Sequence, residues 1–69
     1  MNNLPERINV MRVVTYGVQQ LVDDIHNWRE IDPNEITIED CLEFIQDWVR
    51  EDFGTLDGLI YQDENGEEL

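Results

Sequence analysis

The stretch from Thr37 to Gly54, TIEDCLEFIQDWVREDFG, has the clearest pattern in the chain. Thr37 can cap a first helical turn, with Asp40 in the place of the usual Glu or Gln of a capping box, and Gly54 is a natural left-handed stop. At helical spacing its apolar side chains form one stripe, with acids on the opposite face. The pattern predicts an amphipathic helix over residues 37–54, whose stripe consists of Ile38, Cys41, Leu42, Ile45, Trp48 and Val49.

The acidic face of this predicted helix is the candidate binding surface. Four carboxylates repeat there at i, i+4 spacing and form an acid ladder of Glu39, Glu43, Asp47 and Glu51. Each such like-charge pair costs about 0.2–0.5 kcal/mol, and local conflicts of this kind are more common at functional surfaces. A merely solvated face is the equal alternative. The predicted partner-binding residues are Glu39, Asp40, Glu43, Phe44, Asp47 and Glu51.

Phe44 has a distinct role in this prediction. It is displaced from the apolar stripe toward the acids, so it can act as an apolar anchor in a charged rim. The alternative is that the C-terminal segment covers it. Trp28 and Trp48 fall on the apolar stripes of their predicted helices and are expected in the core.

Residues 5–30 also carry apolar side chains at helical spacing. Pro5 suits the first turn of a helix, and Gly17 interrupts the pattern, either to let another helix pack closely or to bend this one. The β-branched residues just before Gly17 weaken the helix locally. The apolar positions are Leu4, Ile8, Met11, Val14, Val18, Leu21, Val22, Ile25 and Trp28.

The predicted fold class is therefore mainly α, in a single small acidic domain spanning residues 1–69. A long N-terminal helix, which Gly17 can bend, packs antiparallel on the shorter acidic helix. A short irregular or β-like strap over residues 59–61 follows, and residues 63–69 are expected to form a frayed acidic tail. The alternative is a compact three-helix monomer, with the first helix split at Gly17.

Self-association is expected from the small size and the surplus apolar surface. A chain of 69 residues buries a modest core. Val10, Val13 and Tyr16 lie outside the main stripe of the predicted first helix, where two packed helices would leave them uncovered. The expected state is a homodimer.

The charge of the chain restricts its partners. The net charge is −13, lysine is absent, and residues 31–69 hold thirteen acids against Arg50. Such a surface repels nucleic acid and anionic membranes, so neither is expected to bind directly. It attracts basic protein surfaces and accelerates association with them.

The composition offers little chemistry. Cys41 and His26 are the only residues of their kinds, so a disulfide within the chain is excluded and no metal site or cofactor is expected. The segment Asp63-x-Asn65-Gly66 resembles part of an EF-hand loop but fails at both ends. We expect a non-enzyme. One apolar cysteine, no signal peptide and no apolar run of about 20 residues predict a cytoplasmic protein without a membrane span.

These features predict a small acidic binding protein that occupies a basic surface, as a nucleic-acid mimic or an inhibitor of a nucleic-acid-binding enzyme. The acid ladder would rise about 6 Å per step, near every second phosphate along a DNA strand. In style the chain resembles small phage-type inhibitors of host nucleic-acid enzymes, anti-CRISPR and anti-restriction proteins among them. No family motif matches, so no residue roles are carried over. The alternatives are an adaptor or regulatory subunit docking through an apolar helix surface, and an antitoxin or immunity protein neutralising a basic toxin.

Overall fold

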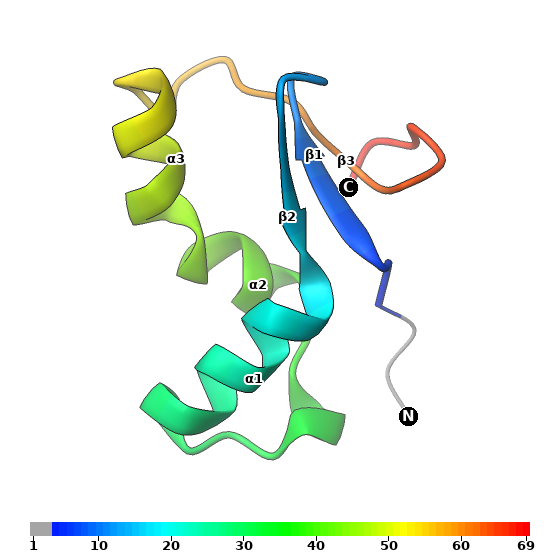
Figure 1. The fold of residues 1–69 in the computed structure, drawn as a ribbon, viewed down its shortest axis with the longest axis vertical. Coiled ribbons are helices and arrows are strands. Elements are labelled where there is room, and N and C mark those ends of the chain that lie inside the picture. The colour runs from blue at the N-terminus through cyan, green and yellow to red at the C-terminus, as the bar shows by residue number, and fades with distance from the viewer. Residues whose placement is uncertain (1–3) are drawn as a thin grey trace.

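The computed structural model describes residues 4–69, and there it combines three α-helices with a three-stranded antiparallel sheet. The prediction of a mainly α fold is therefore wrong: the protein is a small mixed α/β domain in which two strands precede the helices (Figure 1). Along the chain the elements are β1 (Arg7–Val10), β2 (Val14–Gly17), α1 (Val18–Arg29), the 3₁₀ turn η1 (Pro33–Glu35), α2 (Ile38–Phe44), α3 (Gln46–Phe53) and β3 (Tyr61–Gln62).

The first half of the predicted N-terminal helix is a β-hairpin. Ile8 and Val10 are fully buried while Arg7 is exposed, which is the two-residue period of a strand. Ile8 pairs with Tyr16 across the hairpin, so both side chains face the helices. The β-branched residues 13–15, which weaken a helix, favour a strand for the same steric reason.

The hairpin turns at Met11 and Arg12, which have φ values of 53° and 60°. The Val13 N–H donates to the Val10 carbonyl at 2.9 Å and closes the turn. Turns of this hand usually carry Asn-Gly, because glycine enters the left-handed region without steric cost. A Met-Arg pair gives no such signal, and the hairpin was therefore not visible in the sequence.

The third strand completes the sheet from the far end of the chain. The strand order of the sheet is β2-β1-β3, and β3 pairs with β1 through Val10 with Tyr61 and Asn9 with Gln62. Residues 63–69 turn back along β3. There the Gly66 N–H donates to the Asp63 carbonyl at 3.0 Å, and the Leu69 N–H donates to the Tyr61 carbonyl at 2.8 Å. The C-terminal segment thereby covers the outer edge of β3.

The acidic segment forms two helices where one was predicted. The capping box is confirmed, because Thr37 Oγ1 accepts from the Asp40 N–H at 3.2 Å and Asp40 Oδ2 accepts from the Thr37 N–H at 3.0 Å. Gly54 ends α3 with a φ of 77°, as predicted. Between these ends, Ile45 departs from helical geometry with a ψ of −4°. The chain changes direction there, so α2 and α3 point different ways (Figure 1).

The core lies between one face of the sheet and the helices. Figure 1 shows the strands side by side, with α3 beyond β2 and with α1 and α2 toward the end opposite the hairpin tip. The helices contribute most of the buried side chains. The buried apolar residues are Ile8, Val10, Val18, Leu21, Val22, Ile25, Ile36, Cys41, Ile45 and Val49.

Two expectations about apolar residues are wrong. Trp28 is 80% exposed and Trp48 is 38% exposed, so neither belongs to the core. Of the three residues that suggested self-association, Val10 is fully buried, Tyr16 is partly buried against the core and Val13 is exposed. Within residues 4–69, each helix is too short or too polar to cross a membrane.

Candidate partner-binding surface

The acid ladder lies on two helices. Glu39 and Glu43 belong to α2, and Asp47 and Glu51 belong to α3. All four are exposed, and the side chains of Glu43 and Asp47 retain 66% and 89% of their accessible surface. Because the helix direction changes at Ile45, the four carboxylates do not form one straight row, and the even spacing along a DNA strand does not hold across the bend.

Two other carboxylates of the segment are used by the fold. Asp40 is half-buried, and its carboxylate satisfies the Thr37 N–H at the start of α2. Asp52 accepts a hydrogen bond from the Tyr16 hydroxyl at 2.6 Å and joins α3 to β2. Of the predicted binding residues, Asp40 therefore has a structural role.

Two arginines lie beside the ladder. Arg29 Nη1 is 3.9 Å from Glu43 Oε2, and Arg50 Nη1 is 3.4 Å from Asp47 Oδ1. Both pairs are exposed, and exposed ion pairs contribute at most about 1 kcal/mol. Breaking either ion pair therefore costs little free energy, so Glu43 and Asp47 are free to contact a cation on another protein.

Three aromatic side chains, those of Phe44, Trp48 and Tyr16, lie in contact beside the ladder. Phe44 is half-buried beneath Arg29, whose guanidinium carbon lies 5.6 Å from the ring centroid. The Trp48 ring meets Phe44 edge-on at 5.7 Å and Tyr16 at 6.0 Å. Phe44 also packs against the buried core. Trp48 is the partly exposed aromatic of this surface. The sequence predicted it in the core, because its contact with Tyr16 of β2 leaves no signal in the local sequence.

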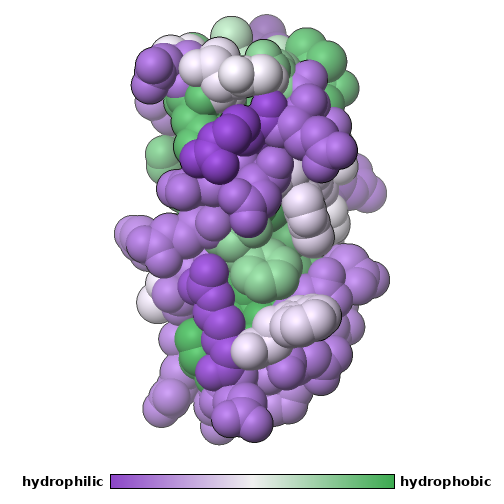
Figure 2. Space-filling view, turned by 90° about the vertical axis from the view of Figure 1, so that its left-hand side faces the viewer, coloured by the Kyte–Doolittle hydropathy of each residue, from purple (hydrophilic) through white to green (hydrophobic). Residues whose placement is uncertain are grey.

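Figure 2 looks onto the side of the molecule where α3 lies in Figure 1. A small apolar area lies near the centre of this face with near-neutral residues beside it, and hydrophilic residues surround it. An apolar area within a polar rim is the usual anatomy of a protein-binding surface.

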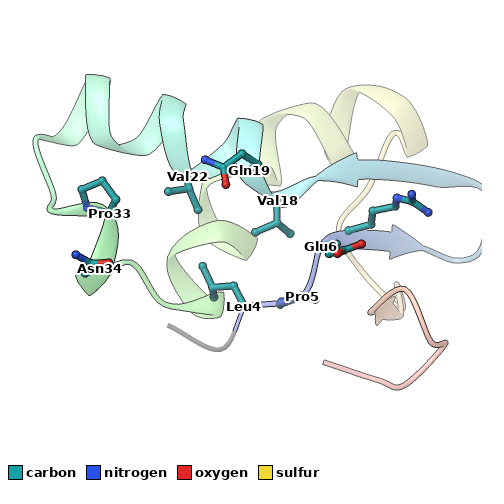
Figure 3. Close-up of a pocket in the computed structure, with 9 residues that line it drawn as sticks. Leu4, Pro5, Glu6, Val18, Gln19, Val22, Pro33 and Asn34 are labelled. Carbon is teal, nitrogen blue, oxygen red and sulfur yellow. The ribbon is translucent and has the colours of Figure 1, made fainter. Parts of the chain in front are cut away.

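A separate groove of about 670 Å³ lies between the chain before β1, the first turns of α1, and η1 (Figure 3). Leu4, Val18 and Val22 line its apolar part. Among the lining residues within 4–69, Glu6 is the one carboxylate, and histidine and cysteine are absent. The groove therefore lacks the paired groups that general acid–base chemistry requires.

The histidine and the cysteine lie elsewhere. His26 Nδ1 is 3.0 Å from the Ile31 carbonyl oxygen near the end of α1. Cys41 is fully buried, and burial, assisted by the charge of Asp40, raises the pKa of its thiol to about 11. The thiol is therefore neutral at physiological pH and unsuited to nucleophilic attack. Among residues 4–69, no three His, Cys, Asp or Glu side chains gather in a way that could hold a metal ion.

Comparison of the chain with protein families, curated proteins and solved structures gives no match.

Proposed function

We propose that the protein is a small acidic binding protein that occupies a basic surface of a partner protein. The observation that carries the proposal is the exposed acid ladder beside the partly exposed Trp48, on a chain with a net charge of −13. Long-range attraction would bring the partner's cations to the ladder, and Trp48 would supply an apolar anchor. The role is non-enzymatic.

The partner class that fits best is a nucleic-acid-binding enzyme, whose basic channel the acids would block as a nucleic-acid mimic or inhibitor. Such channels are lined with cations for phosphates, and a carboxylate cluster can occupy them in the place of phosphate. The bend at Ile45 leaves two carboxylate pairs at an angle, and this shape suits a curved groove better than a straight one. An antitoxin or immunity protein that neutralises a basic toxin would use the same surface.

One observation favours a second candidate, an adaptor or regulatory subunit that docks through an apolar helix surface. Trp28, in the last turn of α1, is 80% exposed. Large exposed aromatics are enriched among the residues that dominate binding energy. In this alternative the acids keep the chain soluble and Trp28 makes the contact.

An affinity pull-down at low and high salt, followed by identification of the bound protein, tests the proposal. Binding through the ladder should be strong at low salt and weak at high salt, because ions screen exposed charges. A partner retained equally at both salt concentrations would contradict the acidic-surface proposal and favour docking through Trp28. The proposed compartment is the cytoplasm, where the reduced state of Cys41 would persist.

A further inference from the structure

The hairpin differs in charge from the rest of the molecule. Residues 7–22, RINVMRVVTYGVQQLV, contain Arg7 and Arg12 and no carboxylate, and they form the longest acid-free stretch of the chain. Two molecules with a net charge of −13 repel each other on approach. The hairpin is where two copies can meet with the least repulsion.

The second strand leaves one edge of the sheet open. The Val18 N–H donates to the Glu6 carbonyl at 3.0 Å, and the register directs the backbone groups of Val14 and Tyr16 toward β1. The backbone N–H and C=O groups of Thr15 and Gly17 therefore point away from β1, toward the open edge. Both residues are exposed, and a Cβ added at Gly17 would meet no atom within 4 Å.

This edge lacks the usual protection against pairing. Natural sheets protect their edges with charged residues, proline, bulges or a covering segment. The residues of β2, VTYG, include neither a charge nor a proline. The opposite edge, on β3, is covered by the C-terminal segment through the Leu69 N–H and the Tyr61 carbonyl. Beside the open edge, Val13 is 75% exposed.

We propose that two copies of the chain associate by antiparallel pairing of their β2 strands, with Thr15 at the two-fold axis. The two three-stranded sheets would then form one sheet of six strands. Thr15 would exchange two N–H···O bonds with the partner subunit's Thr15, because the backbone groups of this residue point outward. Val13 would lie opposite the partner's Gly17, where the missing side chain leaves room.

The charges are compatible with this register. The two copies of Arg12 would stand six residues apart along the paired strands, about 20 Å at 3.4 Å per residue, so they do not repel strongly. The ladder on α2 and α3 is not part of the interface. The inference is independent of the proposed function, and either can fail alone.

Sedimentation equilibrium from micromolar to submillimolar concentration tests the interface with a charge exchange. Thr15→Lys and Thr15→Glu each place like charges opposite each other across the axis, and each should weaken dimerisation at least ten-fold. An equimolar mixture of the two variants places Lys opposite Glu and should restore the dimer. Far-UV circular dichroism checks that each variant is folded.

A crosslink gives a second measurement that does not depend on the charged variants. In hydrogen-bonded antiparallel pairs the Cα atoms lie about 5.5 Å apart, within the range that a disulfide spans. Oxidised Thr15→Cys should therefore form a covalent dimer, whereas the exposed control Thr55→Cys should not. Cys41 is buried and does not interfere. A monomeric wild type throughout the concentration range, Thr15→Lys dimers as tight as wild type, or equal crosslinking at residues 15 and 55 would each overturn the proposal.

Discussion

The Tyr16 hydroxyl donates a 2.6 Å hydrogen bond to the Asp52 carboxylate and thereby ties β2 to the last turns of α3. The two residues are 36 positions apart in the chain. Burial, followed by this hydrogen bond and the negative charge of Asp52, raises the pKa of Tyr16 well above its ordinary value. The tyrosine therefore remains a neutral donor over the whole physiological range.

Removal of this hydroxyl should loosen the joint between hairpin and helix. Tyr16→Phe keeps the ring against Trp48 and removes only the donor, so it should lower the free energy of unfolding by about 1 kcal/mol. Urea denaturation followed by tryptophan fluorescence measures the change. Tyr61→Phe is the control, because within residues 4–69 the Tyr61 hydroxyl makes no hydrogen bond. Equal losses in the two variants would argue against the Asp52 contact.

The buried thiol predicts a loss of stability at alkaline pH. The pKa of Cys41 rises from 9.0 to about 11 in the folded protein, so between these values the unfolded chain loses a proton that the folded chain keeps. Ionisation of the thiol therefore stabilises the unfolded state relative to the folded state, and the free energy of unfolding falls as the pH rises. Between pH 8 and about 10.5, ionisation of the Cys41 thiol should lower the free energy of unfolding by about 2 kcal/mol.

Cys41→Ala separates this effect from other titrations. The variant is less stable at pH 8 because it leaves a small cavity, but its free energy of unfolding should decline less toward alkaline pH than that of the wild type. Urea titrations at a series of pH values give both slopes. Parallel slopes would show that the thiol is not protected by burial.

The turn at Met11 and Arg12 predicts a stabilising substitution. Arg12 has a φ of 60°, a conformation that costs a side-chain-bearing residue about 1–2 kcal/mol and glycine little. Arg12→Gly should therefore raise the free energy of unfolding by about 1 kcal/mol. Arg7→Gly removes the same charge from β1 and should destabilise the protein, because glycine weakens a strand. Urea denaturation of the two variants measures both changes. A lower free energy of unfolding in Arg12→Gly as well as in Arg7→Gly would argue against the left-handed turn.

Gly17 offers a further test of the corrected fold. It lies at the N-cap of α1 with φ −74° and ψ 123°, and no side chain caps this end of the helix. Gly17→Ser can accept a hydrogen bond from the second or third helical N–H and should be about 0.5–1 kcal/mol more stable than Gly17→Ala. In a mid-helix position Ala would be the more stable variant, so the order of the two melting temperatures distinguishes the folds.

The parts of the fold that could be predicted are those with local causes. The capping box of Thr37 and Asp40 and the stop at Gly54 need only neighbouring residues, and both are present. Cys41 is buried because it follows the helical period of its own segment. The acids of the ladder are exposed for the same reason, as local periodicity separates them from the core.

The rest depends on contacts that local periodicity does not encode. Ile8 and Val14 fit a helical spacing as well as positions on two strands, and only their partners across the sheet, Tyr16 and Val10, decide between the two structures. The pairing of Tyr61 with Val10 closes a long loop, for which the sequence carries no marker. Trp48 follows the apolar stripe but lies beyond the bend at Ile45, where the surface of the core turns away from it.

The acid ladder predicts a charge-dependent interface, and the ion pair between Glu43 and Arg29 suggests which carboxylates to reverse. Glu39→Lys with Asp47→Lys leaves that pair intact. It also makes the ladder alternate in sign, so each lysine gains an oppositely charged neighbour at i, i+4 spacing. The fold should remain intact, with small losses at the helix N-termini, where acids are preferred.

Binding of the partner found by pull-down should weaken at least ten-fold in this double variant, mainly through slower association, because each lysine would face a cation. Surface plasmon resonance at two salt concentrations measures both rates. Glu35→Lys with Glu67→Lys, two exposed positions outside α2 and α3, changes the net charge equally and should reduce association far less. Trp48→Ala tests the anchor and should raise the dissociation rate. If the ladder variant and the control bind alike, the partner responds to net charge alone, and the ladder is a solvated face.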